Sequence, residues 1–436
     1  MDNIIRKLMT IALPALMLFI AASGTGKTGN EAIWSGLRKV GVSFGPWHSF
    51  GVLIFVGLVA NSFSHFAVDD SLIKFYHKRR ELEKLDILIA EIDKLPLSKD
   101  LKIKLKWNVL HGTYQPMSWN FLISRYVTIA TIAVTLFSAA SSLHGEYRLF
   151  ELASHFKLQY LIFGCCSCIF FAITRAQKWR LLVGIFCIII NLVEIMPWYL
   201  PQPAFAATTP GQQLRVFHFN VLTSNQQYAD VISLVREEKP DVAVFVEVSV
   251  PWAQELKALS DTFPYSFGHQ DNIGFGSAIY SKFPLENTAI KAFSTGRKTL
   301  LADVKFQGKI VSMLLAHPNI PLKDSSFSDR NQHLAGLGEY AAQVKNPLVV
   351  VGDFNITMWS PFYKNMVKTG GLRNARSGFG VLPTWPTFMP LLYIPIDHLL
   401  VTKEIAVSKV HTGRNVGSDH LPLIADLLIA GSKSSD

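Results

Sequence analysis

The stretch Pro347-Leu-Val-Val-Val-Gly-Asp-Phe-Asn355 decides the fold of the second half of this chain. It begins with an apolar, valine-rich run, which favours a buried β-strand. The run ends at a glycine, and the residues that follow include a carboxylate, Asp353, and an amide, Asn355. A buried strand that ends in this way holds its polar groups at the rim of a sheet. The stretch therefore predicts a sheet with polar chemistry along one edge.

Similar strand ends recur through the same half of the chain. Asn220 ends one β-like run and Glu247 ends another, while Asp397 and the pair Asp419 and His420 follow further along. Carboxylate and amide oxygens are hard ligands that suit magnesium or manganese when several of them converge. Each motif is weak alone, but their recurrence in this order predicts one shared site.

Between these motifs, β-like runs alternate with short helical patterns. This mixed order predicts an α+β fold in which two sheets pack face to face with helices outside. We expect strands at residues 214–221, 242–247, 277–282, 309–316, 348–352, 398–402 and 421–427, and helices at 225–238, 328–344 and 360–368.

From roughly Leu214 to Leu428 the chain resembles the endonuclease/exonuclease/phosphatase superfamily, which includes DNase I-like nucleases, sphingomyelinases and inositol-polyphosphate phosphatases. The resemblance rests on the motifs above and on three further matches. These are Gly274-Phe-Gly-Ser-Ala-Ile-Tyr-Ser-Lys-Phe-Pro284, His317 at a strand end, and Pro383-Thr-Trp-Pro386. It implies the DNase I-like fold and hydrolysis of a phosphoric ester, but not a substrate, because the surrounding loops set that choice.

The resemblance also implies a role for each polar residue. Asp353 would orient or deprotonate the attacking water, Asn355 would hold the phosphate, and His317 would donate towards a phosphoryl or leaving oxygen. His420 would face the phosphate with Asp397 fixing its tautomer. The implied cofactor is Mg²⁺ or Mn²⁺, with Asn220, Glu247 and Asp419 as its ligands. Taken singly, such residues also serve as turn formers, helix caps or ordinary strand-end groups.

Four further features stay open or are excluded. Arg330 and Asn331 suit either phosphate contact or a solvated helix start. The apolar segment Phe379 to Ile396 suits lipid contact, a substrate pocket, or packing under the domain. We exclude His218 and His398 from the site because neither fits a family position, and strand alternation directs His398 away from Asp397.

Composition points to a membrane protein. The chain of 436 residues is 49% hydrophobic and 17% charged, against about 25% charged in an average chain. Residues 214–436 carry 21 Lys and Arg against 19 Asp and Glu, whereas residues 1–213 carry 21 against 13. The catalytic half thus lacks the basic surplus of a nonspecific nucleic-acid binder. All four cysteines fall in apolar runs, where they suit packing.

Three apolar segments predict membrane helices: Phe121 to Leu143, Leu158 to Thr174 and Leu181 to Leu200. Two shorter runs, Met9 to Ser23 and Phe50 to Phe63, suit retained helices, and the first also suits a cleaved signal peptide. The polar turn Ser23 to Thr28 resembles a phosphate-binding loop but lacks the first glycine of that motif.

The expected domains are two apolar segments (1–66), a charged amphipathic cytoplasmic helical region (67–120), three transmembrane helices (121–200), a linker (201–213) and the catalytic domain (214–430).

Basic residues predict the orientation of these segments. Ten Lys and Arg lie between Ala67 and Asn120, and short basic loops stay in the cytoplasm. Three crossings then place the catalytic domain on the non-cytoplasmic side of the cell (inner) membrane. The predicted function is a membrane-tethered, metal-dependent phosphoesterase whose partners are the lipid bilayer and a phosphodiester. An extracytoplasmic DNase I-like nuclease acting on nucleic acid and a catalytically silent scaffold are the alternatives.

Overall fold

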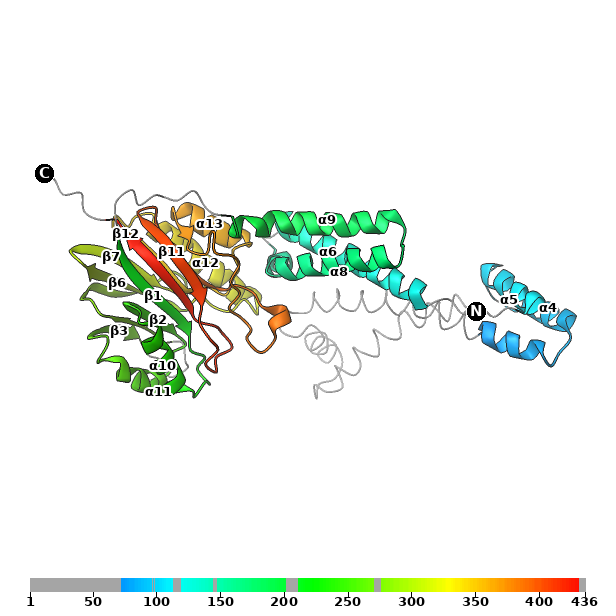
Figure 1. Ribbon diagram of the computed structural model, residues 1–436, viewed down its shortest axis with the longest axis horizontal. Helices are drawn as coiled ribbons and strands as arrows, with labels where there is room; N and C mark the ends of the chain where they lie inside the picture. The colour runs from blue at the N-terminus through cyan, green and yellow to red at the C-terminus, as the bar shows by residue number, and fades with distance from the viewer. Residues whose placement is uncertain are drawn as a thin grey trace. The chain divides into compact units, whose positions relative to one another are not determined.

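The computed structural model describes residues 72–95, 97, 99–112, 119–143, 147–200, 211–269 and 276–430 (Figure 1). It divides into two compact units, residues 1–132 with 169–181 and residues 133–168 with 182–436. The apolar segments expected within residues 1–66, the turn Ser23 to Thr28 and most of the 201–213 linker lie outside the described residues.

The first unit contains a small helical bundle with its own core. A helix over residues 72–80 is followed by α4 (Leu85–Lys94) and α5 (Lys99–His111). Arg79 forms ion pairs with Glu83 at 2.6 Å and Glu91 at 2.8 Å. The buried core consists of Tyr76, Leu88, Ile92, Leu101, Leu105 and Val109. Part of the apolar face expected in this region is therefore packed between its own helices.

Two mixed six-stranded sheets form the second half of the chain. The first has the order β11-β12-β1-β2-β4-β3 and the second β5-β6-β7-β8-β10-β9. The first sheet consists of β11 (Ile405–Thr412), β12 (Leu423–Ile429), β1 (Gln212–Asn220), β2 (Val242–Val246), β4 (Ser277–Ser281) and β3 (Tyr265–His269). The second consists of β5 (Leu285–Ala292), β6 (Lys298–Phe306), β7 (Lys309–Leu315), β8 (Leu348–Asp353), β10 (Asp397–Val401) and β9 (Arg373–Asn374).

Side-chain alternation explains how the sheets pack. Along β1, Val216 joins a core shared by both sheets, whereas Phe217 joins a cluster under α10 (Tyr228–Glu238) and α11 (Val250–Glu255). The second sheet likewise buries its outer face against α12 (Asp324–Ala341) and α13 (Pro361–Thr369). Because helices cover the outer faces, the central strands are apolar on both sides. The expected α+β sandwich flanked by helices is confirmed.

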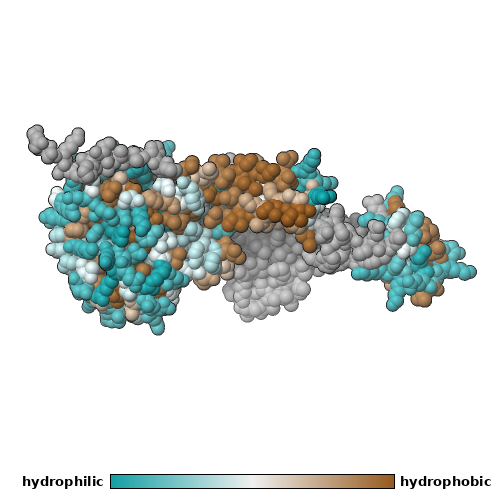
Figure 2. Space-filling view, in the orientation of Figure 1, coloured by the Kyte–Doolittle hydropathy of each residue, from teal (hydrophilic) through white to brown (hydrophobic). Residues whose placement is uncertain are grey.

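Helices precede the sheets: α6 (Trp119–Leu143), α7 (Arg148–Ser154), α8 (Lys157–Ile173), α9 (Lys178–Ile195) and the short turn η1 (Met196–Trp198). Among the described residues, the segment Lys178–Trp198 is long and apolar enough to cross a membrane, and α7 with α8 would add a second span across a 68° bend. The apolar helix Tyr126–Ser142 is shorter. Figure 2 shows apolar side chains gathered over these helices. The three crossings stay a prediction.

Parts of these helices pack directly on the sandwich. Ile195 belongs to the cluster formed by α12, α13 and the second sheet, and Leu158, Leu161 and Trp198 pack against it. At the surface, Lys364 pairs with Glu194 at 2.9 Å. The start of α8 and the end of α9, both in the second unit, thus share a hydrophobic cluster with the sandwich.

Candidate active site

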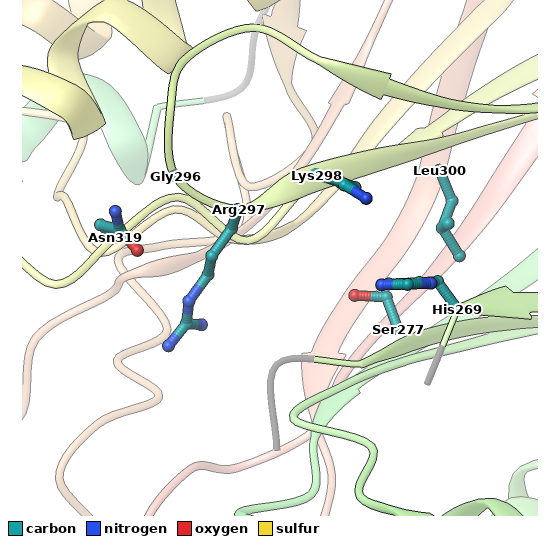
Figure 3. A pocket seen from close by; sticks show the side chains of 7 residues that line it. All are labelled: His269, Ser277, Gly296, Arg297, Lys298, Leu300 and Asn319. Atoms are coloured by element: carbon teal, nitrogen blue, oxygen red, sulfur yellow. The ribbon is translucent and has the colours of Figure 1, made fainter. Parts of the chain in front are cut away.

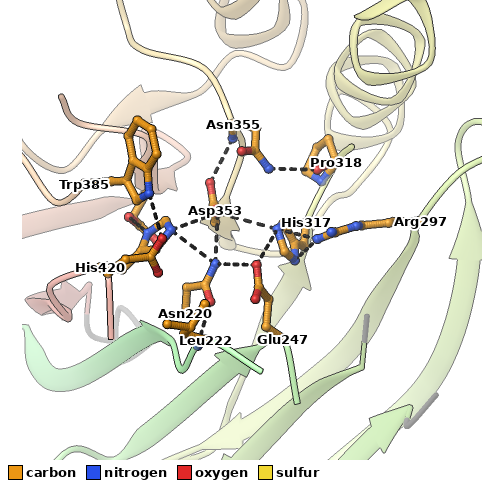
Figure 4. A network of polar contacts seen from close by, with 12 residues as sticks. Asn220, Leu222, Glu247, Arg297, His317, Pro318, Asp353, Asn355, Trp385 and His420 are labelled. Carbon is orange, nitrogen blue, oxygen red and sulfur yellow. Dashed lines mark hydrogen bonds and ion pairs between the residues drawn. The ribbon is translucent and has the colours of Figure 1, made fainter. Parts of the chain in front are cut away.

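The two sheets bring their polar strand ends to one edge (Figure 4). Because β1 and β2 run parallel with Asn220 opposite Val246, Asn220 lies beside the next residue, Glu247. In the second sheet, antiparallel pairing sets Asp353 of β8 opposite Asp397 of β10. Residues far apart in the sequence therefore meet because of strand register alone.

Asn220 lies at the centre of this network. Its Nδ2 donates to Glu247 Oε1 and to Asp353 Oδ2, each at 3.1 Å. The same nitrogen lies 3.4 Å from His420 Nε2. Its Oδ1 accepts from the Leu222 backbone N–H at 3.0 Å. One buried amide thus links the ends of both sheets.

Two site residues have left-handed backbone conformations. Glu247 has a φ of 62° immediately after β2, and Asn355 has a φ of 52° shortly after β8. Such values are uncommon for residues other than glycine and cost about 1–3 kcal/mol each, so they persist where the surroundings enforce them. Here the sharp turns direct the chain away from the buried strands at the point where the polar side chains gather.

Asp397 holds two imidazoles. Its Oδ2 contacts His420 Nδ1 at 2.8 Å, and its Oδ1 contacts His218 Nε2 at 3.0 Å. Excluding His218 from the site on sequence grounds therefore missed a direct contact. The alternation of side chains along a strand could have identified His218 as a site residue, because His218 and Asn220 are two residues apart on β1 and share a face. His398 instead contacts Asn374 Nδ2 and the carbonyl of Ile356.

The charges of this group depend on one another. Burial lowers the pKa of His420, but the carboxylates of Asp397 and Asp353 outweigh burial and raise it to about 10. Burial raises the pKa of Asp397 and of Asp353, but the charge of His420 and the neighbouring imidazoles outweigh it and hold both below the ordinary value. At neutral pH the site therefore contains a charged imidazole between two carboxylates.

His317 follows β7 and is buried on the other side of Asp353. Its Nε2 lies 3.5 Å from Asp353 Oδ2 and 3.9 Å from Glu247 Oε1. Burial and the nearby charge of Arg297 lower its pKa, which favours a neutral ring. The guanidinium of Arg297 contacts this ring. Arg297 was not predicted as a site residue, because no strand-end motif marks it in the sequence.

Asn355 and Arg330 are hydrogen-bonded to each other next to Asp353. Asn355 donates its backbone N–H to Asp353 Oδ1 at 2.9 Å and its Nδ2 to the Pro318 carbonyl at 3.0 Å. Arg330 Nη1 donates to the Asn355 carbonyl at 3.0 Å. Both open interpretations of Arg330 are corrected, because the side chain is buried and pairs with Glu151 of α7 at 3.0 Å.

The predicted ligand Asp419 lies between the site and the apolar segment. Its Oδ2 accepts from Trp385 Nε1 at 2.9 Å. Its Oδ1 is buried and has no hydrogen-bond partner among the described residues. An unpaired buried carboxylate oxygen is costly unless a cation or a donor meets it. Asp419 therefore has a free ligand atom beside His420.

The residues present suit a divalent cation. Four carboxylates line the site, from Glu247, Asp353, Asp397 and Asp419, and the cationic groups among them are His420 and Arg297. This leaves an excess of negative charge that a doubly charged ion would balance. Ligand atoms of Asp353, Asp397 and His420 lie within 4.8 Å of one another, close enough to hold one ion.

A cavity of about 350 Å³ adjoins the site on the Arg297 side (Figure 3). Its polar lining includes Arg297, Lys298, His269 and Asn319. Arg297 and Lys298 bring basic side chains to this lining, so the cavity suits an anionic or hydroxyl-rich group. Arg297 connects this cavity with the site, because it lines the cavity and contacts His317.

Comparison with known protein families gives one match to this chain. Residues 217–420 match the model of the endonuclease/exonuclease/phosphatase family. No curated protein matches the sequence.

Several solved structures are similar at low identity. An endonuclease/exonuclease/phosphatase from Beutenbergia cavernae is 20% identical, with 51% of this chain and 72% of that chain covered and a TM-score of 0.42. D. rerio TDP2 in complex with a single-strand DNA product is 16% identical, with 50% and 99% covered and a TM-score of 0.44. The 3′ phosphatase NExo from Neisseria, bound to a product DNA hairpin, is 19% identical, with 49% and 98% covered and a TM-score of 0.42.

The family match spans the strand ends that form the site, from β1 to His420. Residues 217–420 therefore match a domain of the endonuclease/exonuclease/phosphatase family, and this domain has the features of a phosphoric ester hydrolase.

Proposed function

We propose that this protein is a membrane-tethered, divalent-metal-dependent phosphoesterase that hydrolyses a phosphodiester by in-line attack of water. One observation carries the proposal: Asn220, Glu247, Asp353, His317 and His420 form a single contact network around one point. Such a convergence of carboxylates, imidazoles and an amide supplies the proton transfer and the charge stabilisation that phosphate chemistry requires.

Asp353 is the group proposed to orient or deprotonate the water. Asn220 Nδ2 donates to one of its oxygens and the Asn355 backbone N–H to the other, so the carboxylate is held in one orientation. Its lowered pKa keeps it ionised and able to accept a proton at neutral pH. Asn355, whose Nδ2 donates to the Pro318 carbonyl in this structure, would hold the phosphate.

The two imidazoles flank Asp353 with different charges. His420, charged and fixed by Asp397, would stabilise the phosphate oxygens. His218 supports Asp397 from the opposite oxygen. His317, buried and neutral, would donate a hydrogen bond towards the phosphoryl or leaving oxygen.

Asn220, Glu247 and Asp419 would hold the ion, Mg²⁺ or Mn²⁺. These residues have amide and carboxylate oxygens, the ligands that such ions prefer, and Asp419 has an oxygen without a partner. When bound, the ion supplies Lewis acidity and neutralises charge on the phosphate. His420, fixed by Asp397, would face the phosphate beside this ion.

The membrane tether and its direction are part of the proposal. The apolar segment Lys178–Trp198 leads directly to the catalytic domain, and the basic residues before it favour a cytoplasmic start. We therefore place the catalytic domain on the non-cytoplasmic side of the cell membrane. A reporter fusion at Gln213 tests this placement: activity of a reporter that works only in the cytoplasm would reject it.

The enzymatic proposal is tested with the full chain in detergent and in proteoliposomes. Hydrolysis of bis-p-nitrophenyl phosphate should require magnesium or manganese. Asp353→Ala and His420→Ala should abolish it with folding intact, whereas Asp303→Asn, outside the site, should keep it. Near-full activity of either alanine variant would overturn the assignment.

Two alternatives have distinct outcomes. A nuclease would cleave DNA with a strong dependence on salt; the cationic cavity and the DNA-bound relatives give this alternative its support. A panel of phospholipids, inositol phosphates and DNA therefore decides the substrate class. Complete absence of metal-dependent cleavage in that panel would leave the silent scaffold.

A further inference from the structure

The loop between β9 and β10 carries a tip of exposed apolar side chains. Phe388 is 70% exposed, Met389 44%, Leu391 85% and Leu392 41%. The last two belong to the turn η3 (Pro390–Leu392). A concentration of large apolar groups on one loop indicates a contact surface. The tip does not pack under the domain, which was one of the expectations for this segment.

The base of this loop is fixed to the active site. Trp385 Nε1 donates to Asp419 Oδ2 at 2.9 Å. The Thr387 backbone N–H donates to the Asp419 carbonyl at 2.9 Å, and the Tyr393 hydroxyl donates to the Thr387 carbonyl at 3.1 Å. These bonds hold the tip away from the domain. A surface that binds the tip is therefore held at a fixed distance from Asp419.

The other end of the loop is fixed to helix α8. Gln159 Nε2 donates to the Tyr393 carbonyl at 2.8 Å. One turn along α8, Ile162 is 55% exposed, and on α9 Phe186 and Ile189 are 54% and 52% exposed. In Figure 1 the turn at residues 390–392, drawn in orange, lies on the side of the sandwich from which α8 extends. The apolar tip therefore continues the surface that is proposed to face lipid.

We propose that the tip Phe388–Leu392 enters the lipid leaflet next to α8 and α9, and that the substrate is a lipid of this leaflet whose phosphodiester reaches the site past Trp385. The proposal rests on the proposed function, which supplies the tether and the hydrolysis. Continuity with the membrane helices is what selects a bilayer over a protein as the occupant of the apolar surface.

The Arg297 side of the site suits the polar end of such a lipid. In Figure 4, Trp385 and Arg297 lie on opposite sides of Asp353. Arg297 also lines the cavity of about 350 Å³ together with Lys298 and His269. A lipid phosphodiester has one apolar end and one polar end, and the site offers one surface for each. The cavity would accommodate the polar head group.

The location of the tip is tested without any assay of activity. A background with Cys165, Cys166, Cys168 and Cys187 changed to alanine receives a single cysteine by Leu391→Cys or, as a control, by Ile290→Cys. Ile290 is 42% exposed on β5, the edge of its sheet opposite β9. Both proteins are labelled with an environment-sensitive fluorophore in vesicles of phosphatidylethanolamine and phosphatidylglycerol.

The label at position 391 should be quenched by spin labels on the lipid acyl chains. It should also be roughly fivefold less accessible to iodide than the label at position 290, because an interfacial group is shielded from water. Equal iodide accessibility at both positions would overturn the docking. This result does not depend on whether the enzyme is active.

The substrate is tested with Leu391→Glu and the control Ile290→Glu in the same vesicles. Cleavage of vesicle phospholipid should fall roughly tenfold in Leu391→Glu, because a charge in the leaflet opposes insertion. Hydrolysis of soluble bis-p-nitrophenyl phosphate should not change, and the control should keep both activities. Unchanged lipid cleavage in Leu391→Glu, or a wild type that cleaves the soluble ester but no lipid, would reject a lipid substrate. A wild type that cleaves neither would reject the proposed function instead.

Discussion

Replacing Glu151 by leucine should destabilise the catalytic domain, although Glu151 belongs to helix α7 and not to the sandwich. Its carboxylate lies 3.0 Å from Arg330 Nη2, and both side chains are completely buried. Burial lowers the pKa of Arg330 and the charge of Glu151 raises it, so the guanidinium depends on this partner. Glu151→Leu would leave a buried charge without compensation.

Breaking a buried ion pair of this kind costs about 3–5 kcal/mol. For a unit of this size, each kcal/mol lowers the melting temperature by roughly 2–4 °C, so Glu151→Leu should lower it by about 6–20 °C. The double variant Glu151→Leu/Arg330→Met should recover most of the loss, because apolar residues of similar volume can replace a buried pair. Its activity should stay reduced, since Arg330 also supports the Asn355 carbonyl.

The surface pair of Glu194 and Lys364 provides the matched control. It also joins a helix to the sandwich, but the Lys364 side chain is 52% exposed. Glu194→Leu should therefore cost only about 0–1 kcal/mol. The assay is thermal and urea unfolding of the full chain in detergent, followed by tryptophan fluorescence. A loss below about 1 kcal/mol for Glu151→Leu, or a double variant as unstable as the sum of the two single variants, would refute the reasoning.

Three other predictions concern the site and its surroundings. Asp353→Asn should lower the kcat for bis-p-nitrophenyl phosphate by a factor of roughly 10²–10⁴, with little change in melting temperature. A loss in kcat below about fivefold would contradict the role of Asp353. EDTA should abolish activity and magnesium should restore it, and Asp419→Asn should raise the magnesium concentration required; an unchanged metal titration in that variant would remove Asp419 from the ligand set. Burial lowers the pKa of His333 to about 4, so the unfolded chain takes up a proton first as the pH falls from 6.5 towards 4. Stability should therefore decrease over this window by up to about 3 kcal/mol, and less in His333→Gln, as urea unfolding at pH 7 and pH 4.5 would measure.

Most interior strands could be predicted from the sequence because both of their faces are buried, although the interior strand β6 was not expected. Residues 348–353 read as a continuous apolar run, and the structure places β8 there. The edge strand β5 gave no such signal, because most of its residues are exposed and its sequence alternates weakly. Patterns that arise from burial thus locate the centre of a sheet better than its edges.

The strand-end residues of the site were also predictable, because parallel and antiparallel register brings strand ends together. The partners of those residues were not. Nothing in the sequence near Arg330 indicates that its partner is Glu151, on a helix far away in the chain. His218 could have been found from its position two residues before Asn220, since both face the same side of β1. Arg297 lies in a loop without any periodic pattern, so only the fold brings it to His317.

The contact of Glu151 with Arg330 has a consequence for biosynthesis. Glu151 is translated well before Arg330, so the helices exist before the sandwich can close around them. A fragment that begins after the helices would have to fold without the Glu151 carboxylate that pairs with Arg330. We therefore expect the helical segment to act as a template during folding, and a detached catalytic fragment to fold slowly and in low yield.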